Sequence, residues 1–363
     1  MIISELNSLY KRYGYRQFKM TNFETYDLYA DNRDFLRSNQ VITFTDLDGS
    51  LMALKPDVTL SIIKFNRGSE EKVFYNENVY RPKDHRYKEI LQAGIECIGN
   101  IDSYSEAEVI ALAAKSLRLI SDKYVLRISD AAFLKQMFDA FGLGDKVETE
   151  ALRLFSMKDA AGFDKLVEKQ YITEACANTL KGMADLYMPF REGVRELKRY
   201  AVSNVAAQMA DHLAGLSDIF ESFGVLNSIY LDFSVVNSMD YYNGILFQGA
   251  IADIPFTVLL GGRYDKLPEK MGKHVGAIGF ALYLDTVENY LTKPYDYDVD
   301  YLIIYESGKD DPVKLAATVE ALNRTGCTVR SIRQDEIDKV EHSIKSRKIL
   351  RLQEAVKEAA KTC

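Results

Sequence analysis

The sequence predicts an α+β fold, an antiparallel sheet flanked by helices, with a mostly helical insertion and a small α/β unit at the C-terminal end. Short strand-like segments cluster at both ends of the first part of the chain, and a stretch between them has apolar residues spaced by three and four. A strand–helix–strand pattern follows near the end of the sequence. This grouping is typical of α+β proteins and differs from an alternating parallel βαβ array.

The chain is long enough for one large domain and a smaller one. It has 363 residues, of which 47% are hydrophobic and 27% are charged, as in globular proteins with a sizeable core. We expect a large domain over residues 1–292, a small α/β unit over 297–363, and a linker at 292–296. The net charge of -7 argues against a general nucleic-acid binder, because phosphate contacts need clustered lysine and arginine.

The sequence shows no signal for a membrane, a disulfide or a metal. The N-terminal segment lacks the apolar stretch of a signal peptide, and no apolar run is long enough to span a bilayer. The four cysteines contain no CxxC pair, and the four histidines are scattered, as expected for surface or loop positions. We therefore expect a cytoplasmic protein that binds no metal and no cofactor.

Apolar periodicity and turn residues predict the elements of the first third of the chain. A helix is expected from Ile3 to Leu9, with Gly14 marking its end. A capping box at Ser105 and Glu108 predicts the start of a second helix, which continues to Leu117. Strands are expected at 41–44, 50–54, 72–80 and 88–99, the first two joined by a turn at 46–49.

The rest of the chain is predicted to begin with helices and to return to strands. Helical spacing covers the insertion at about 130–222. Strands are expected at 228–236, 245–250 and 256–260, and a helix is expected to begin near Gly276. The C-terminal unit is predicted as a strand at 299–305, a helix at 312–323, a strand at 327–332 and an amphipathic helix at 340–361.

Polar residues alternate with apolar ones along the predicted strand at 88–99. Because side chains alternate between the two faces of a strand, Gln92 and Glu96 point into the same space. Gly94 lies between them and leaves room, since it has no side chain. This pattern predicts a polar pocket for a small ligand, and the alternative is an ordinary half-exposed strand with a solvated polar face.

A second polar and aromatic segment follows the helical insertion. Tyr241 and Tyr242 can form flat apolar walls with hydroxyl groups, although core packing is an alternative interpretation. The pair Gly261 and Gly262 permits a tight turn and a close backbone approach. The phosphate-loop patterns GxxxxGK[ST] and GxGxxG after a strand are absent, so this segment is not a typical nucleotide-binding loop.

Six segments occur in one specific order. They are 44–46 (FTD), 54–59 (LKPDVT), 79–81 (VYR), 86–99 (RYKEILQAGIECIG), 240–244 (DYYNG) and 261–265 (GGRYD). In this order they resemble the catalytic core of histidyl-tRNA synthetases, which are class II enzymes, over about residues 1–290. The resemblance implies a histidine pocket formed by Asp57, Thr59, Arg81, Gln92, Glu96, Tyr241 and Tyr242. Asp57 stands where that family usually has glutamate, which leaves open a different amino acid as ligand.

The sequence departs from the synthetase pattern where ATP would bind. Asn237 and Thr286 align with two arginines of that family, and Tyr283 replaces a glycine. Loss of one such charge-stabilising contact typically costs about 10²–10³ in rate, so activation of an amino acid by ATP is not expected. The loop from Arg81 to Arg86 is short and lacks the family's glutamate, and Thr21 replaces a motif 1 proline. The C-terminal unit also looks too short for a full anticodon-binding domain.

A synthetase-like core that retains the histidine ligands and lacks the ATP ligands resembles the ATP phosphoribosyltransferase regulatory subunits. This resemblance implies a non-catalytic protein that takes part in the first step of L-histidine biosynthesis. It also implies two partners, a short-form catalytic subunit and L-histidine as feedback effector, and dimers of this chain within a hetero-oligomer.

Two other functions are compatible with the sequence. One is a divergent histidyl-tRNA synthetase or a related ATP-dependent amino-acid ligase, against which Asn237 and Thr286 argue. The other is a tRNA- or partner-binding module with an unused pocket. Its only support is the basic stretch at 345–351, which we interpret as the solvated face of the last helix.

Overall fold

The computed structural model describes residues 2–36, 40–83, 86–236, 241–291, 297–337 and 344–362. The chain divides into two compact units, Met1–Glu288 and Asn289–Cys363. The segment 292–296, predicted as a linker, lies outside the described residues. Among the described helices, none is long and apolar enough to cross a membrane.

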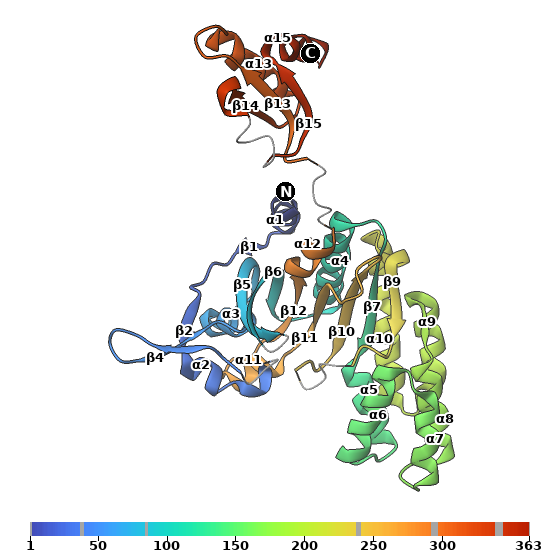
Figure 1. The fold of residues 1–363 in the computed structure, drawn as a ribbon. Coiled ribbons are helices and arrows are strands. Elements are labelled where there is room, and N and C mark those ends of the chain that lie inside the picture. The colour runs from blue at the N-terminus through green and yellow to red at the C-terminus, as the bar shows by residue number, and fades with distance from the viewer. Residues whose placement is uncertain are drawn as a thin grey trace. The chain divides into compact units, whose positions relative to one another are not determined.

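A nine-stranded sheet forms the centre of the first unit (Figure 1). In spatial order its strands are β1 (Arg16–Gln17), β5 (Glu71–Lys83), β6 (Arg86–Gly99), β12 (Gly276–Tyr283), β11 (Leu259–Arg263), β10 (Ile245–Ile251), β7 (Tyr124–Asp130), β9 (Ile229–Asp232) and β8 (Tyr187–Pro189). Neighbouring strands are antiparallel except in the pairs β1–β5 and β7–β9, which are parallel. The predicted α+β class is confirmed, but the sheet is mixed and not wholly antiparallel.

The helical insertion explains the parallel pair β7–β9, because parallel neighbours need a long crossover connection. Between these two strands the chain forms α5 (Ala131–Ala140), α6 (Asp145–Met157), α7 (Ala160–Glu168), α8 (Glu174–Ala184), α9 (Phe190–Leu197) and α10 (Asn204–Ser222), with 3₁₀ turns η2 (Lys198–Tyr200) and η3 (Leu226–Ser228). Figure 1 shows these helices grouped beside the end of the sheet that contains β7 and β9. The helices occupy the interval where helical spacing was predicted, and strand β8 interrupts them.

The two faces of the sheet carry different cores. On one face, α1 (Ile2–Arg12), α4 (Ser103–Ile120) and α10 share an apolar cluster with sheet residues such as Ile95 and Phe280. On the other face a smaller cluster includes residues of α2 (Tyr26–Ala30), η1 (Arg33–Phe35), α3 (Thr59–Phe65) and α11 (Lys266–Lys270). A three-stranded sheet lies near it, formed by β2 (Phe23–Thr25), β3 (Thr43–Thr45) and β4 (Leu51–Leu54). Gly49, with a φ of 87°, closes the predicted turn between β3 and β4.

Two predictions for the strands next to the site are wrong. The helix expected near Gly276 is strand β12, and α12 (Leu284–Leu291) starts only after it. An eight-residue run of small and apolar residues cannot distinguish a buried strand from a helix, and β12 is paired on both sides. Gly261 and Gly262 do not form a turn but lie within β11, where they permit close packing, since a Cβ on Gly262 would lie 2.8 Å from the Tyr242 ring.

The predicted capping box at Ser105 is also wrong. Helix α4 begins two residues earlier, and Asp102 is its N-cap, with a side chain that accepts a hydrogen bond from the Ser105 amide at 2.8 Å. Glu108 cannot close a capping box because it lies well beyond the third helical position, and its carboxylate accepts hydrogen bonds from Tyr15 and Lys72. An aspartate at the N-cap satisfies an amide that would otherwise have no partner within the helix.

The C-terminal unit is a three-stranded parallel sheet with helices. Its strands β14 (Val329–Arg333), β13 (Val299–Tyr305) and β15 (Ser346–Arg351) lie in that order, with α13 (Pro312–Arg324), η4 (Gln334–Glu336) and α15 (Leu352–Thr362). The helix predicted over 340–361 is wrong at 346–351, where the basic stretch forms β15, and its residues 340–343 lie outside the described ranges. Polar and apolar residues alternate there in a way that also suits a strand, and α15 follows without a gap.

Candidate functional site

One cavity of about 260 Å³ lies on the sheet face that carries α3 and α11. All seven residues predicted as ligands line it, and they come from four parts of the chain: Asp57, Thr59, Arg81, Gln92, Glu96, Tyr241 and Tyr242. The cavity also contains side chains that the sequence did not predict as site residues: Phe35, Tyr75, Tyr264 and Tyr283. The size is at the small end of ligand pockets, which suits a small molecule such as an amino acid.

Strand β6 places Gln92 and Glu96 on the same face, as predicted. Each side chain is only 2% exposed, which excludes the alternative of a solvated polar face. In the register of the sheet, Glu96 pairs with Gly279 of β12 and Gln92 pairs with Tyr283. The Glu96 carboxylate therefore lies over Gly279, where β12 has no side chain, whereas Gln92 lies beside the Tyr283 side chain.

The sequence suggested that Gly94 leaves open space between Gln92 and Glu96, and the structure shows that it does not. It pairs with Tyr75 of β5, and a Cβ on Gly94 would lie 2.5 Å from the Tyr75 hydroxyl. The absent side chain therefore makes room for the tyrosine ring, which is buried and forms part of the cavity wall. The sequence pattern located the gap in the strand but could not show which side chain from a neighbouring strand fills it.

Two hydroxyl groups hold the Glu96 carboxylate. Thr59 donates to one oxygen at 2.7 Å and Tyr264 donates to the other at 2.5 Å. Burial raises the pKa of Glu96 to about 8, although both hydrogen bonds favour the ionised form. A Cβ on Gly279 would overlap this carboxylate, so the glycine is needed for the position of Glu96. Near neutral pH the site thus holds a carboxyl group that a cationic ligand would ionise.

Asp57 and Arg81 form a second polar group in the cavity. Asp57 precedes α3 and accepts a hydrogen bond from the Leu60 amide at 3.1 Å. Arg81 lies 3.3 Å from the other Asp57 oxygen and donates through Nε to the Pro56 carbonyl. The cavity is therefore lined by one carboxylate and one guanidinium that pair with each other.

The amide of Gln92 is the clearest sign that the cavity binds something. Its Nε2 atom is buried and has no hydrogen-bond partner in the described part of the chain. A buried donor without a partner costs roughly 1–3 kcal/mol, so such groups are rare unless a ligand or water satisfies them. Gln92 lines the cavity, and a polar group of a ligand there would remove this cost.

Aromatic rings form the remaining walls. Tyr241 contacts Tyr242 and Tyr264 with ring centroids 4.7 and 5.5 Å apart, and Phe35 packs edge-on against Tyr241 at 5.8 Å. Tyr264 was part of a segment that carried the resemblance, but only the structure shows that it holds Glu96. Phe35 comes from a region where no sequence signal indicated a site.

The structure describes Thr286 but not Asn237. Thr286 lies in the first turn of α12, and Asn237 lies outside the described residues, as do His85 and His342. His212 lies at the surface, as predicted, and its Nε2 also lies 2.7 Å from the buried Glu106 carboxylate. No group of three or more histidine, cysteine, aspartate or glutamate residues within the described ranges could hold a metal ion.

This sheet, with a small polar cavity on one face, is the arrangement expected of a class II aminoacyl-tRNA synthetase-like core. The family model for histidyl-tRNA synthetase matches residues 1–287, which is more than half of the sequence. The chain therefore belongs to the histidyl-tRNA synthetase family.

Similar proteins within and around this family include regulatory subunits. An ATP phosphoribosyltransferase regulatory subunit from Acetivibrio thermocellus is 25% identical over 330 residues, which cover 86% of this chain and 78% of the relative. The crystal structure of an ATP phosphoribosyltransferase regulatory subunit/histidyl-tRNA synthetase from Bacillus halodurans has a TM-score of 0.80 at 19% identity, over 96% of this chain and 92% of that one. The predicted resemblance to the regulatory subunits is confirmed by the names of these relatives.

A second similar structure comes from a complex. It is an ATP phosphoribosyl transferase (HisG:HisZ) complex from Thermotoga maritima, which matches with a TM-score of 0.62 at 16% identity. The match covers 78% of this chain and 96% of that chain. At 16% identity this similarity shows a common fold and nothing further.

Proposed function

We propose that this chain is the regulatory subunit of an ATP phosphoribosyltransferase and that its cavity binds L-histidine as a feedback effector. The names of its relatives support the first part. The observation that carries the second part is the cavity, in which seven predicted ligand residues meet around an unpartnered amide.

The chemistry of the cavity suits histidine. Glu96 and Asp57 can accept hydrogen bonds from an α-ammonium group or an imidazole N–H, and Arg81 can face the α-carboxylate. Gln92 Nε2 can donate to an imidazole nitrogen or a carboxylate oxygen. Tyr241 and Tyr242 provide flat surfaces against which an imidazole ring can stack.

The same cavity is poorly equipped to activate an amino acid with ATP. Tyr283 lines it at the position where the synthetase pattern has a glycine, so its ring takes up space there. Thr286 offers no charge in place of an arginine, whereas phosphoryl chemistry depends on cations around the phosphates. These features support a sensing role, with the chemistry left to a partner.

The proposed partner is the short-form catalytic subunit of ATP phosphoribosyltransferase, in a hetero-oligomer that contains dimers of this chain. The complex among the similar structures supports an assembly of this kind. Feedback requires that histidine binds two states of the assembly with unequal affinity, because a ligand shifts an equilibrium only by that difference.

Calorimetry tests the proposed ligand. We expect L-histidine to bind the isolated chain, and we expect Glu96→Gln to weaken binding at least about tenfold by removing a charge-assisted hydrogen bond. Glu89→Gln is a matched control on the same strand, because Glu89 is exposed and bonds to Asn78 and Tyr80. Absence of histidine binding, or equal effects of the two variants, would contradict the proposed ligand.

An activity assay tests the proposed partner. Phosphoribosyl-ATP formation by a short catalytic subunit should increase when this chain is added, and histidine should then inhibit it through Glu96. Histidine-dependent pyrophosphate exchange by this chain alone would instead favour a divergent histidyl-tRNA synthetase. No effect of the chain on the transferase would rule out the regulatory function.

A further inference from the structure

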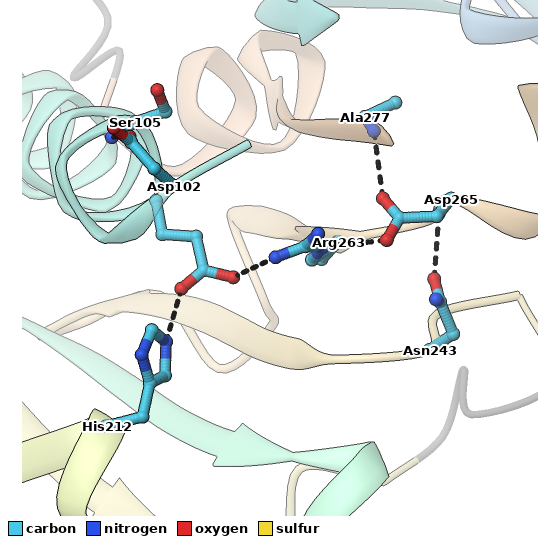
Figure 2. Close-up of polar contacts among 8 residues, drawn as sticks. Asp102, Ser105, His212, Asn243, Arg263, Asp265 and Ala277 are labelled. Carbon is cyan, nitrogen blue, oxygen red and sulfur yellow. Dashed lines mark hydrogen bonds and ion pairs between the residues drawn. The ribbon is translucent and has the colours of Figure 1, made fainter. Parts of the chain in front are cut away.

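A network of polar residues lies where β11 ends (Figure 2). We call it the Arg263 network, and it consists of Glu106, His212, Asn243, Arg263 and Asp265. Asn243 follows Tyr242 in sequence, and Arg263 and Asp265 flank Tyr264. Two of the cavity's tyrosines are thus next to members of the network.

The network clamps the two tyrosine-bearing segments together. The Asn243 amide donates to the Arg263 carbonyl at 3.0 Å, and the Asp265 amide donates to the Asn243 side-chain oxygen at 2.7 Å. Asp265 also accepts a hydrogen bond from the Ala277 amide of β12 at 2.9 Å. These bonds fix Tyr242 relative to Tyr264, which in turn holds Glu96.

Arg263 connects this clamp to the helices on the other side of the sheet. Its guanidinium donates to Asp265 and, through Nη1, to Glu106 of α4, each at 2.8 Å. The second Glu106 oxygen lies 2.7 Å from His212 Nε2 of α10. Glu106 is 3% exposed, so loss of either partner would leave a buried charge poorly compensated.

We infer that the Arg263 network is a positioning device that couples the ligand cavity to helix α10 of the helical insertion. A displacement of α10 that breaks the His212–Glu106 contact changes the charges around Arg263, and through Asp265 and Asn243 it shifts the tyrosine walls. By linkage, a ligand that fixes those walls stabilises the present position of α10. The network thereby links the cavity to helix α10, where a partner subunit can sense ligand binding.

The inference rests on the proposed function only for the identity of the ligand.

The groups that face His212 are Glu106 of α4, Asp130 at the end of β7 and Arg263 of β11. Because both carboxylates and the guanidinium belong to the sheet and its covering helix, His212 is the member through which the insertion enters the network.

Four variants test the coupling through two measurements. Histidine affinity is measured by calorimetry, and the position of the tyrosine wall is measured in the ligand-free protein by ¹⁹F NMR of 3-fluorotyrosine placed at Tyr241. The variants are Arg263→Met, His212→Leu, His212→Gln and, as a matched control, Arg191→Ala. The control removes ion pairs from α9 to Asp218 and Glu221 of α10, but it does not touch the network.

We expect His212→Leu to weaken histidine binding about fivefold, as for one lost hydrogen bond, and Arg263→Met to weaken it further. Both should shift the ¹⁹F signal. His212→Gln, whose amide can still donate to Glu106, should restore both readouts, and Arg191→Ala should leave them unchanged.

The outcomes separate this inference from the proposed function. If the wild-type chain binds histidine but Arg263→Met and His212→Leu change neither readout, the coupling is overturned. If the wild-type chain does not bind histidine while the ¹⁹F signal still shifts, the proposed ligand is wrong and the positioning role stands. If the wild-type chain does not bind histidine and the variants do not shift the ¹⁹F signal, both the proposed ligand and the positioning role are wrong. An equal effect of Arg191→Ala would indicate general destabilisation of α10 and would also overturn the coupling.

Discussion

At the scale of single residues, the buried Glu96 carboxyl makes the cavity sensitive to the charge of what it binds. Its pKa of about 8 arises from burial, because the two hydroxyl donors offset only part of the cost of removing a charge from water. A ligand that brings a positive charge into contact with Glu96 replaces that lost solvation. The residue therefore favours cationic groups over neutral ones of the same size.

Proton release on binding follows from this pKa. At about pH 7 Glu96 is mostly protonated in the free chain, and a ligand ammonium group would favour its ionised form, so we expect up to about one proton to be released. Calorimetry in buffers of different ionisation enthalpy measures this number. Glu96→Gln should abolish the release, and an unchanged release in this variant would assign it to another group.

The stability of the free chain should also depend on Glu96. The pKa is raised from 4.5 to about 8 on folding, so the folded chain binds more protons than the unfolded chain between these values. Stability contributed by Glu96 is therefore lost as the pH rises from about 4.5 to 8. We expect Glu96→Gln to become more stable relative to wild type over this range, measured by urea denaturation. A constant difference between the two proteins would contradict the raised pKa.

Gly279 can be tested by adding one methyl group. Gly279→Ala would place a Cβ against the Glu96 carboxylate and near the Ile95 carbonyl, which we expect to destabilise the chain by about 1–3 kcal/mol and to abolish ligand binding. Gly215→Ala is the matched control, because nothing lies within 4 Å of its Cβ position in α10, and we expect it to stabilise by about 0.5–1 kcal/mol. Denaturation curves and ligand titrations of both variants check these values.

At the scale of elements, the sequence correctly predicted features that follow from local periodicity, such as which residues share one face of a strand. Alternation along β6 predicted that Gln92 and Glu96 share a face, and the structure places them there. The helix over β12 was mispredicted because its small and apolar residues are buried between two strands, so no polar face marks a period. Tyr75 and Tyr264 reach the site through strand pairing and a side-chain hydrogen bond, which depend on residues distant in sequence.

Two substitutions at the start of α4 distinguish Asp102, the N-cap in the structure, from Ser105, the N-cap predicted from the sequence. Asp102→Ala should destabilise the chain by about 0.5–2 kcal/mol, because the Ser105 amide loses its partner. Ser105→Ala, which leaves that amide bond intact, should cost less. The pKa of Asp102 is lowered by these hydrogen bonds, so the contribution of Asp102 should be lost as the pH falls below about 4. A larger loss for Ser105→Ala in denaturation experiments would restore the capping box.

At the scale of the whole molecule, the cavity belongs to the first of two units. Its lining residues fall between Asp34 and Tyr283, and the first unit extends to Glu288. The second unit has its own small core around Ile303, Leu322 and Leu352. Ligand binding and the integrity of the C-terminal unit should therefore be separable properties of the chain.

Truncation after Leu291, the last residue of α12, tests this separation. We expect the shortened chain to fold and to bind the ligand with the affinity of the full chain, because no lining residue is removed. A ligand at about 100 times its Kd stabilises the folded state by about 2.7 kcal/mol, which corresponds to a Tm increase of roughly 5 °C for a domain of this size. Scanning calorimetry should show the same ligand-induced shift in both chains. A shift seen only in the full chain would mean that the C-terminal unit contributes to the binding site or to its stability.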